Sequence, residues 1–178
     1  MGFAGLVMAL CLATAQDNTG AAETEQAADT KQAEADVTKQ RLAELDAYWE
    51  KVSKAVGSGD FDSYRSTCHH EGVLVSGSRK MSQPLADALA RWKKEFDATK
   101  AGDMKASVEF RFAERFGDAT TAHETGMFCY ANDSSGKMKK EFIHFEALLV
   151  KRDGDWKILM EYQKSVGTEE EWRALAKP

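Results

Sequence analysis

Glu124 is the side chain whose place in the sequence best suits general acid–base chemistry. It stands in an alternating apolar run, so a strand there would hold its carboxylate on an apolar face. A carboxyl withdrawn from water can act as a general base near neutral pH. The other members of the run are Ala122, Gly126, Phe128 and Tyr130.

Tyrosine hydroxyls would complement such a carboxylate. They can donate hydrogen bonds to a ligand carbonyl or to a developing oxyanion, and the candidates are Tyr48, Tyr130 and Tyr162. We therefore predict Glu124 and Tyr162 as catalytic residues. The alternative is that Glu124 is a rim residue paired with a Lys or Arg.

Histidines and carboxylates suggest zinc chemistry at two places. His69-His70-Glu71 forms one group, and His123, His144 and Glu146 could meet across neighbouring strands. Adjacent histidines tend to point in different directions, and the sequence has no His-x-x-x-His pair. We predict no metal and no other cofactor, with the second group as a polar cluster on the outer face of a sheet.

Cys68 and Cys129 are the two cysteines outside the N-terminal apolar segment. In an exported protein they could form a disulfide, but a sequence does not give their separation, so the bridge stays open. His69 adjoins Cys68, yet no third group supports a catalytic thiol.

Three helices are expected before the strands that carry these residues. Apolar residues recur every three to five positions over residues 37–56, which predicts a long helix that ends at Gly57-Ser58-Gly59. Asp60 is a suitable N-cap for a short second helix. A short strand at residues 73–75 precedes a third helix, capped by Ser82, whose buried stripe includes Trp92.

The second half of the domain has the two-residue period of strands. Four strands are predicted over residues 104–113, 119–131, 141–151 and 156–166. Asp153-Gly154 predicts a two-residue hairpin turn between the last two, and Thr168 with Glu171 predicts a capping box for a short terminal helix. Helices segregated from an antiparallel sheet make an α+β fold.

The hairpin register decides which side chains face the helices. If Arg152 pairs with Asp155, the more apolar face comprises Ile143, Phe145, Ala147, Leu149, Trp156, Ile158, Met160 and Tyr162. A bulge would reverse this assignment. His123, His144 and Glu146 then point outward. We predict that a pocket on the inward face binds its ligand through Tyr48, Trp92, Tyr130, Phe145, Trp156 and Met160.

The net charge of −5 belongs to one short segment. Residues 16–36 hold six acidic residues and one lysine, which leaves 23 acidic and 23 basic residues in residues 37–178. The segment has few large apolar side chains, so we predict a disordered acidic tether. The balanced domain has no basic stripe, which argues against a nucleic-acid partner.

Residues 1–15 are typical of an export signal. An apolar run ends in Ala13-Thr14-Ala15, the small-x-small pattern that signal peptidase cleaves, and it is too short for a stable membrane span. We predict cleavage after Ala15 and a periplasmic or secreted protein. Residues 37–178 then form the single folded domain.

The order of elements resembles the nuclear transport factor 2-like superfamily, which includes SnoaL-like cyclases and ketosteroid isomerase. The matching segments are the first helix with Gly59-Asp60-Phe61, then Gly72-Val73-Leu74-Val75, then the ending from Val150 to Ile158. The resemblance implies a cone-shaped curved antiparallel sheet wrapped around three N-terminal helices, an apolar pocket at the wide end, and a homodimer. It identifies a fold better than an activity.

Three functions are compatible with these patterns. The first is an exported domain that binds a small apolar or amphiphilic ligand in the cone, without necessarily catalysing a reaction. The second is a SnoaL-type isomerase or lyase that uses Glu124; against it, Val75-Ser76 and Ala147 stand where ketosteroid isomerase-like enzymes place acids. The third is a dimerising interaction module.

Overall fold

The computed structural model describes residues 19–175 and divides the chain into two units, residues 1–35 and 36–178. The first helix, α1, runs Thr19–Ser58. Residues 16–36, predicted as a disordered tether, are therefore helical from Thr19 onward, because Ala, Glu, Gln and Lys all favour helix. The predicted export signal at residues 1–15 lies outside the described residues.

Two further helices precede most of the sheet. Helix α2 (Phe61–Ser66) begins at Asp60, whose carboxylate accepts a hydrogen bond of 3.0 Å from the Ser63 amide, as predicted. Helix α3 (Leu85–Ala101) ends at Gly102, whose φ of 83° suits glycine. The prediction of Ser82 as its cap is wrong, since Met81–Pro84 forms an additional strand, β2, and Pro84 takes the N-cap position.

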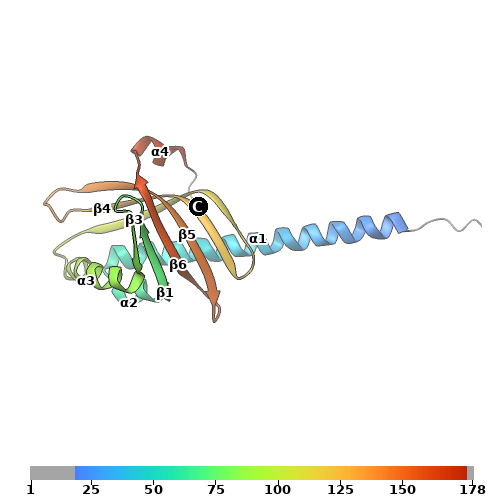
Figure 1. The fold of residues 1–178 in the computed structure, drawn as a ribbon, viewed down its shortest axis with the longest axis horizontal. Helices are drawn as coiled ribbons and strands as arrows, with labels where there is room; N and C mark the ends of the chain where they lie inside the picture. The colour runs from blue at the N-terminus through green and yellow to red at the C-terminus, as the bar shows by residue number, and fades with distance from the viewer. Residues whose placement is uncertain (1–18, 176–178) are drawn as a thin grey trace, which may run out of the picture. The chain divides into compact units, whose positions relative to one another are not determined.

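The sheet has six strands in the order β2-β1-β6-β5-β4-β3 (Figure 1). Besides β2, they are β1 (Cys68–Ser76), β3 (Ala106–Gly117), β4 (Thr121–Asn132), β5 (Lys139–Arg152) and β6 (Asp155–Val166). Strands β1 and β6 pair in parallel and the other neighbours are antiparallel. The predicted Asp153-Gly154 hairpin is confirmed, because Arg152 pairs with Asp155 and both turn residues have positive φ.

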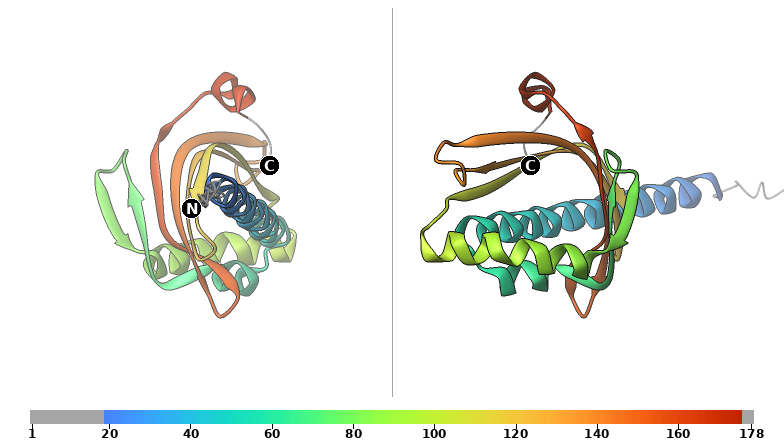
Figure 2. Two further views of the ribbon diagram at one scale, coloured as in Figure 1. Left: turned by 90° about the vertical axis from the view of Figure 1, so that its right-hand side faces the viewer. Right: turned by 60° about the vertical axis from the view of Figure 1, so that its left-hand side comes forward.

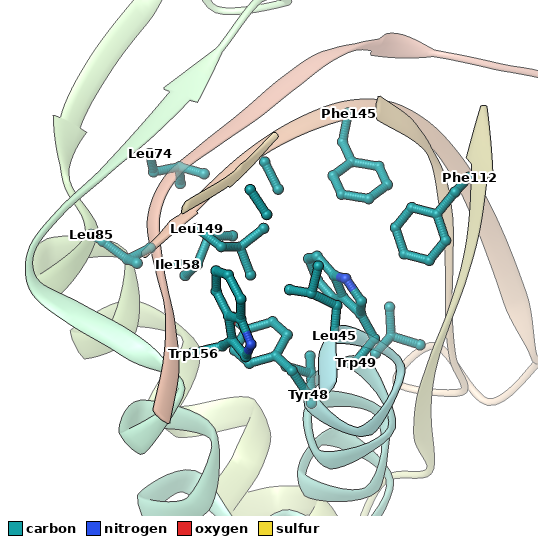
Figure 3. Close-up of a cluster of buried hydrophobic side chains, with 14 of the residues drawn as sticks. Leu45, Tyr48, Trp49, Leu74, Leu85, Phe112, Phe145, Leu149, Trp156 and Ile158 are labelled. Carbon is teal, nitrogen blue, oxygen red and sulfur yellow. The ribbon is translucent and has the colours of Figure 1, made fainter. Parts of the chain in front are cut away.

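The sheet is strongly curved, and the part of α1 after residue 36 lies on its concave side (Figure 2). Trp49 of α1 packs against Phe112 and Phe145 of the sheet, with ring centroids 5.8 and 5.7 Å away, and Leu45 and Tyr48 belong to the same cluster (Figure 3). All five side chains are buried. The predicted α+β cone is thus the observed architecture. Within the described residues, no helix combines the length and apolar character needed to cross a membrane.

A β-bulge in β6 reverses the faces of residues 160–163, after which a further register shift occurs at Lys164. Leu149 pairs with Ile158 but Leu148 pairs with Met160, so Leu159 is an extra residue. Before the bulge, Trp156 and Ile158 face inward as predicted. After it, the inward positions are Glu161 and Gln163, which line a cavity. The predicted inward positions of Met160 and Tyr162 are therefore wrong: both lie on the outer face, the side of the sheet turned away from α1.

A bulge also occurs in β3. Phe112 pairs with Gly126 and Glu114 pairs with Thr125, so Ala113 is extra and Arg115 pairs with Glu124. The bulge turns the Arg115 side chain inward. Gly126 is required at this point, because a Cβ there would lie 2.0 Å from the Arg111 carbonyl oxygen.

The terminal helix α4 (Glu169–Ala174) begins with the predicted capping box of Thr168 and Glu171. Its Trp172 is buried on the outer face against Met127 and Cys129. The guanidinium of Arg111 lies 4.7 Å from the Trp172 ring and donates a hydrogen bond to the Trp172 carbonyl at 3.1 Å. These contacts attach α4 to the sheet.

Candidate functional site

A cavity of about 380 Å³ lies between the concave face of the sheet and the helices. Its wall draws on α1, α2, α3 and every strand of the sheet. Aromatic side chains supply much of the surface, namely Tyr48, Trp49, Tyr64, Trp92, Phe96, Phe110, Phe128, Tyr130 and Phe145. A volume of this size suits a small organic ligand.

Glu161 is the carboxylate that the β6 bulge directs into this cavity. It pairs with Leu74 of β1 and Ala147 of β5, in the middle of the sheet. Its Oε1 accepts a hydrogen bond of 2.7 Å from the Gln163 amide nitrogen. Burial raises the pKa of Glu161 above its usual value, and the Gln163 hydrogen bond opposes this only in part. No basic side chain in residues 19–175 forms an ion pair with it.

Two tyrosines and a cysteine lie within electrostatic reach of Glu161. Burial and the negative charge of Glu161 raise the pKa of Tyr64, and the pKa of Tyr48 is raised chiefly by burial. Burial and the same charge raise the pKa of the Cys68 thiol to about 12, so it is not a reactive thiolate at neutral pH.

The two tyrosines differ in what their hydroxyls can offer a ligand. The Tyr48 hydroxyl donates a hydrogen bond of 3.1 Å to the Thr67 carbonyl. The Tyr64 hydroxyl has no hydrogen-bond partner among the described residues. Tyr64 is therefore a donor that remains available inside the cavity, close to the Glu161 carboxylate.

Charged residues occupy the exposed part of the wall, which we call the rim: Arg79, Arg91, Glu95 and Glu141. The Arg91 guanidinium donates to the Gln83 side-chain oxygen and to the Asp87 carbonyl, each at 3.1 Å. The Tyr130 hydroxyl donates to Glu95 at 3.1 Å. The rim is therefore polar, whereas the interior is aromatic with one carboxylate.

Four of the six predicted ligand-binding residues, Tyr48, Trp92, Tyr130 and Phe145, line the cavity. Trp156 does not. Its indole nitrogen donates to Glu44 at 2.9 Å, and Lys151 contacts the same carboxylate oxygen at 2.6 Å. These hydrogen bonds lower the pKa of Glu44. Met160 is on the outer face, as described above, and does not reach the cavity.

Glu124 lies on the inward face, as predicted, but outside the cavity wall. Its side chain is fully buried and accepts hydrogen bonds of 2.5 Å from the Trp49 indole nitrogen and from Arg115 Nε. Arg115 also contacts Asp46 at 2.5 Å. This matches the alternative in which Glu124 pairs with an arginine, although the residue is in the core instead of at the rim.

The histidine groups occupy two separate places. The rings of His69 and His70 lie 4.4 Å apart at 30°, so the expectation that they point apart is wrong. Donor atoms of these two residues and Glu71 lie within 4.8 Å of one another. On the outer face, His123 contacts Glu146 at 3.6 Å, whereas His144 contacts Glu171 at 3.6 Å, so the predicted cluster is divided.

Cys68 and Cys129 are both free thiols. Cys68 lines the cavity, and Cys129 packs under Trp172 on the outer face. The sheet therefore separates them, and the disulfide that the sequence left open is not formed.

Sequence periodicity missed Glu161 because the bulge interrupts the period. Three consecutive apolar residues, Ile158-Leu159-Met160, do not fit a regular strand that has one solvent-exposed face. Such a run is compatible with an extra residue at its centre, after which the faces exchange. Read this way, the sequence would place Glu161 inward. The bulge at Ala113 had no comparable signal.

Comparison with known proteins shows the fold. No protein-family model matches the sequence, and no curated protein matches it. Among solved structures, a putative scytalone dehydratase from Novosphingobium aromaticivorans is 12% identical over 75% of this chain and 89% of that one, with a TM-score of 0.58.

Two other solved structures agree with this result. A nuclear transport factor 2-like protein of unknown function from Shewanella oneidensis is 17% identical over 68% of this chain and 97% of its own, with a TM-score of 0.54. The β subunit of benzoate 1,2-dioxygenase from Burkholderia mallei is 17% identical over 68% and 87%, with a TM-score of 0.57. At these identities the likeness shows the fold alone, which is the nuclear transport factor 2-like, SnoaL-like fold.

Proposed function

We propose that this chain, whose fold is nuclear transport factor 2-like, binds a small amphiphilic ligand in the cavity of its cone. The observation that carries the proposal is an aromatic cavity of about 380 Å³ whose interior holds one carboxylate, Glu161, without a basic partner in the described residues. Aromatic walls would bury the apolar part of a ligand, and Glu161 with the Tyr64 hydroxyl would orient its polar end.

A neutral fluorescent probe, N-phenyl-1-naphthylamine, tests this proposal. We expect its emission to rise on binding, with one site per chain. Ala106→Trp places a large ring in the cavity wall and should abolish the signal. Glu109→Trp is the matched control, because it adds the same ring to an exposed position of the same strand. Equal binding by both variants, or none by the unmodified chain, would contradict the proposal.

Acid–base catalysis in the same cavity is a second candidate. The pKa of Glu161 is raised by burial, which suits a general base, and the free Tyr64 hydroxyl could stabilise a developing oxyanion. Glu161 thus replaces Glu124 as the carboxylate for the isomerase or lyase hypothesis. On any substrate turned over, Glu161→Gln should lower kcat by at least about 100-fold. Glu124→Gln should change kcat far less, and the opposite ranking would refute this assignment.

Export and homodimerisation remain predictions. We propose that the protein leaves the cytoplasm and loses residues 1–15, so material from its native host should begin at Gln16 by N-terminal sequencing. We also propose a homodimer, which sedimentation at high concentration tests. A chain that starts at Met1, or a monomer at high concentration, would contradict the respective prediction.

A further inference from the structure

The Glu161 carboxylate lacks a positively charged partner. Its only hydrogen bond within residues 19–175 is the neutral amide of Gln163, at 2.7 Å. Two other carboxylates of the domain have cationic partners: the fully buried Glu124 contacts Arg115, and the partly exposed Glu44 contacts Lys151. A carboxylate removed from water is costly unless it is paired. A positively charged ligand would therefore be stabilised more by Glu161 than by the carboxylates that already have a cationic partner.

Aromatic rings surround the space into which this carboxylate points. Tyr64 packs edge-on against Trp92 with ring centroids 6.2 Å apart, and both rings line the cavity. Tyr48 lines it as well, from α1. The faces of such rings carry negative potential and attract organic cations that approach within about 6 Å of the centroid. Rings beside a carboxylate form a combination suited to alkylammonium groups.

The charged groups at the rim do not neutralise Glu161. Arg91 is held by the Gln83 side chain and the Asp87 carbonyl, and Arg79 lies in the exposed turn between β1 and β2. Neither forms an ion pair with a described carboxylate. Two carboxylates, Glu95 and Glu141, accompany them on the rim. The cavity thus carries three carboxylates and two guanidinium groups, and the one charge in its interior is negative.

We propose that the cavity selects ligands that carry an organic ammonium group on an apolar body, with Glu161 as the counterion and the rings of Tyr48, Tyr64 and Trp92 as cation–π partners. This inference rests on the proposed function, since it assumes that the cavity binds ligands. It adds that the ligand carries a positive charge and that Glu161 binds this charge.

The experiment compares three probes of similar shape by their ability to displace N-phenyl-1-naphthylamine at pH 8. The probes are benzyltrimethylammonium, the neutral neopentylbenzene in which carbon replaces nitrogen, and the anion benzylphosphonate. We expect benzyltrimethylammonium to bind at least ten-fold more tightly than the neutral isostere. Benzylphosphonate should bind more weakly than either.

Two Glu→Gln variants test whether the preference for the cation comes from Glu161. Glu161→Gln removes the interior charge and should weaken benzyltrimethylammonium binding at least ten-fold while binding of the neutral dye is unchanged. Glu109→Gln, at an exposed position of β3 outside the cavity wall, should change the cation's affinity less than two-fold.

The possible results separate the inference from the proposed function. Equal affinity for the cation and its neutral isostere, or preference for the anion, overturns the inference but leaves cavity binding intact. Retention of cation preference in Glu161→Gln overturns it as well. Failure of the neutral dye to bind the unmodified chain refutes the proposed function itself, and the inference with it.

Discussion

The buried pair of Glu124 and Arg115 gives the sharpest prediction about stability. Glu124 is 0% exposed and the Arg115 side chain is 15% exposed. The carboxylate has two donors, the Arg115 guanidinium and the Trp49 indole nitrogen. Arg115→Met keeps much of the aliphatic stem but removes the guanidinium, whose Cζ lies 4.3 Å from the Phe112 ring centroid. It leaves the Glu124 charge with one neutral donor.

The expected cost follows from burial. Removing one partner of a buried ion pair destabilises a protein by about 3–5 kcal/mol, because the other charge remains uncompensated. The double variant Arg115→Met/Glu124→Gln removes that charge and keeps an acceptor for Trp49. It should therefore be more stable than Arg115→Met alone by about 2 kcal/mol. Asp46→Asn is the exposed control: its side chain is 43% exposed, so it should cost only about 0–1 kcal/mol.

Urea unfolding followed by tryptophan fluorescence measures these differences. The slope m should stay constant across the variants, so that shifts of the midpoint report stability. A loss of less than about 1 kcal/mol for Arg115→Met would contradict the reasoning, because a buried, unpaired carboxylate would then cost almost nothing. A double variant no more stable than Arg115→Met would also contradict it, since the penalty would not come from the isolated charge.

Other predictions concern backbone packing, the terminal helix and pH. Gly126→Ala should be strongly destabilising in urea because its Cβ would meet the β3 backbone. Gly57→Ala in α1 should instead stabilise by about 0.5–1 kcal/mol, because its Cβ would lie at an ordinary contact distance of 3.8 Å from the Ala106 carbonyl oxygen. Equal effects would argue against the close approach at the β3 bulge. Trp172→Ala should cost about 3–5 kcal/mol, and an unchanged Tm would show that α4 does not contribute to the fold. Burial raises the pKa of Glu161 in the folded state, so the folded state loses stability as pH rises from the ordinary glutamate pKa of 4.5 through that raised pKa. Glu161→Gln should accordingly raise Tm relative to the unmodified chain at pH 8 but not at pH 4, and an equal shift at both values would count against a desolvated carboxylate.

Much of the architecture could be predicted from local patterns. The inward face of β4, the hairpin at Asp153-Gly154 and the capping box at Thr168 follow from alternation and turn chemistry, which act over a few residues. The additional strand β2 was missed because its four residues have no apolar alternation and gain their structure by pairing with β1.

The cavity carboxylate could not be placed by periodicity alone. One extra residue, Leu159, exchanges the faces of β6, so Glu161 enters the cavity while Tyr162 leaves it. In β3 the extra residue Ala113 turns Arg115 toward Glu124, which converts an expected pocket acid into half of a buried ion pair. Both outcomes depend on bulges in the pairing of β5 with β6 and of β3 with β4, and a two-residue period assumes an uninterrupted strand.

The most direct test of the account is the affinity of benzyltrimethylammonium for the unmodified chain and for Glu161→Gln, measured by displacement of N-phenyl-1-naphthylamine. The account predicts that the cation displaces the dye from the unmodified chain and that the substitution weakens the cation at least ten-fold without affecting the dye. Dye binding with no loss of cation affinity in Glu161→Gln would contradict the role given to this carboxylate.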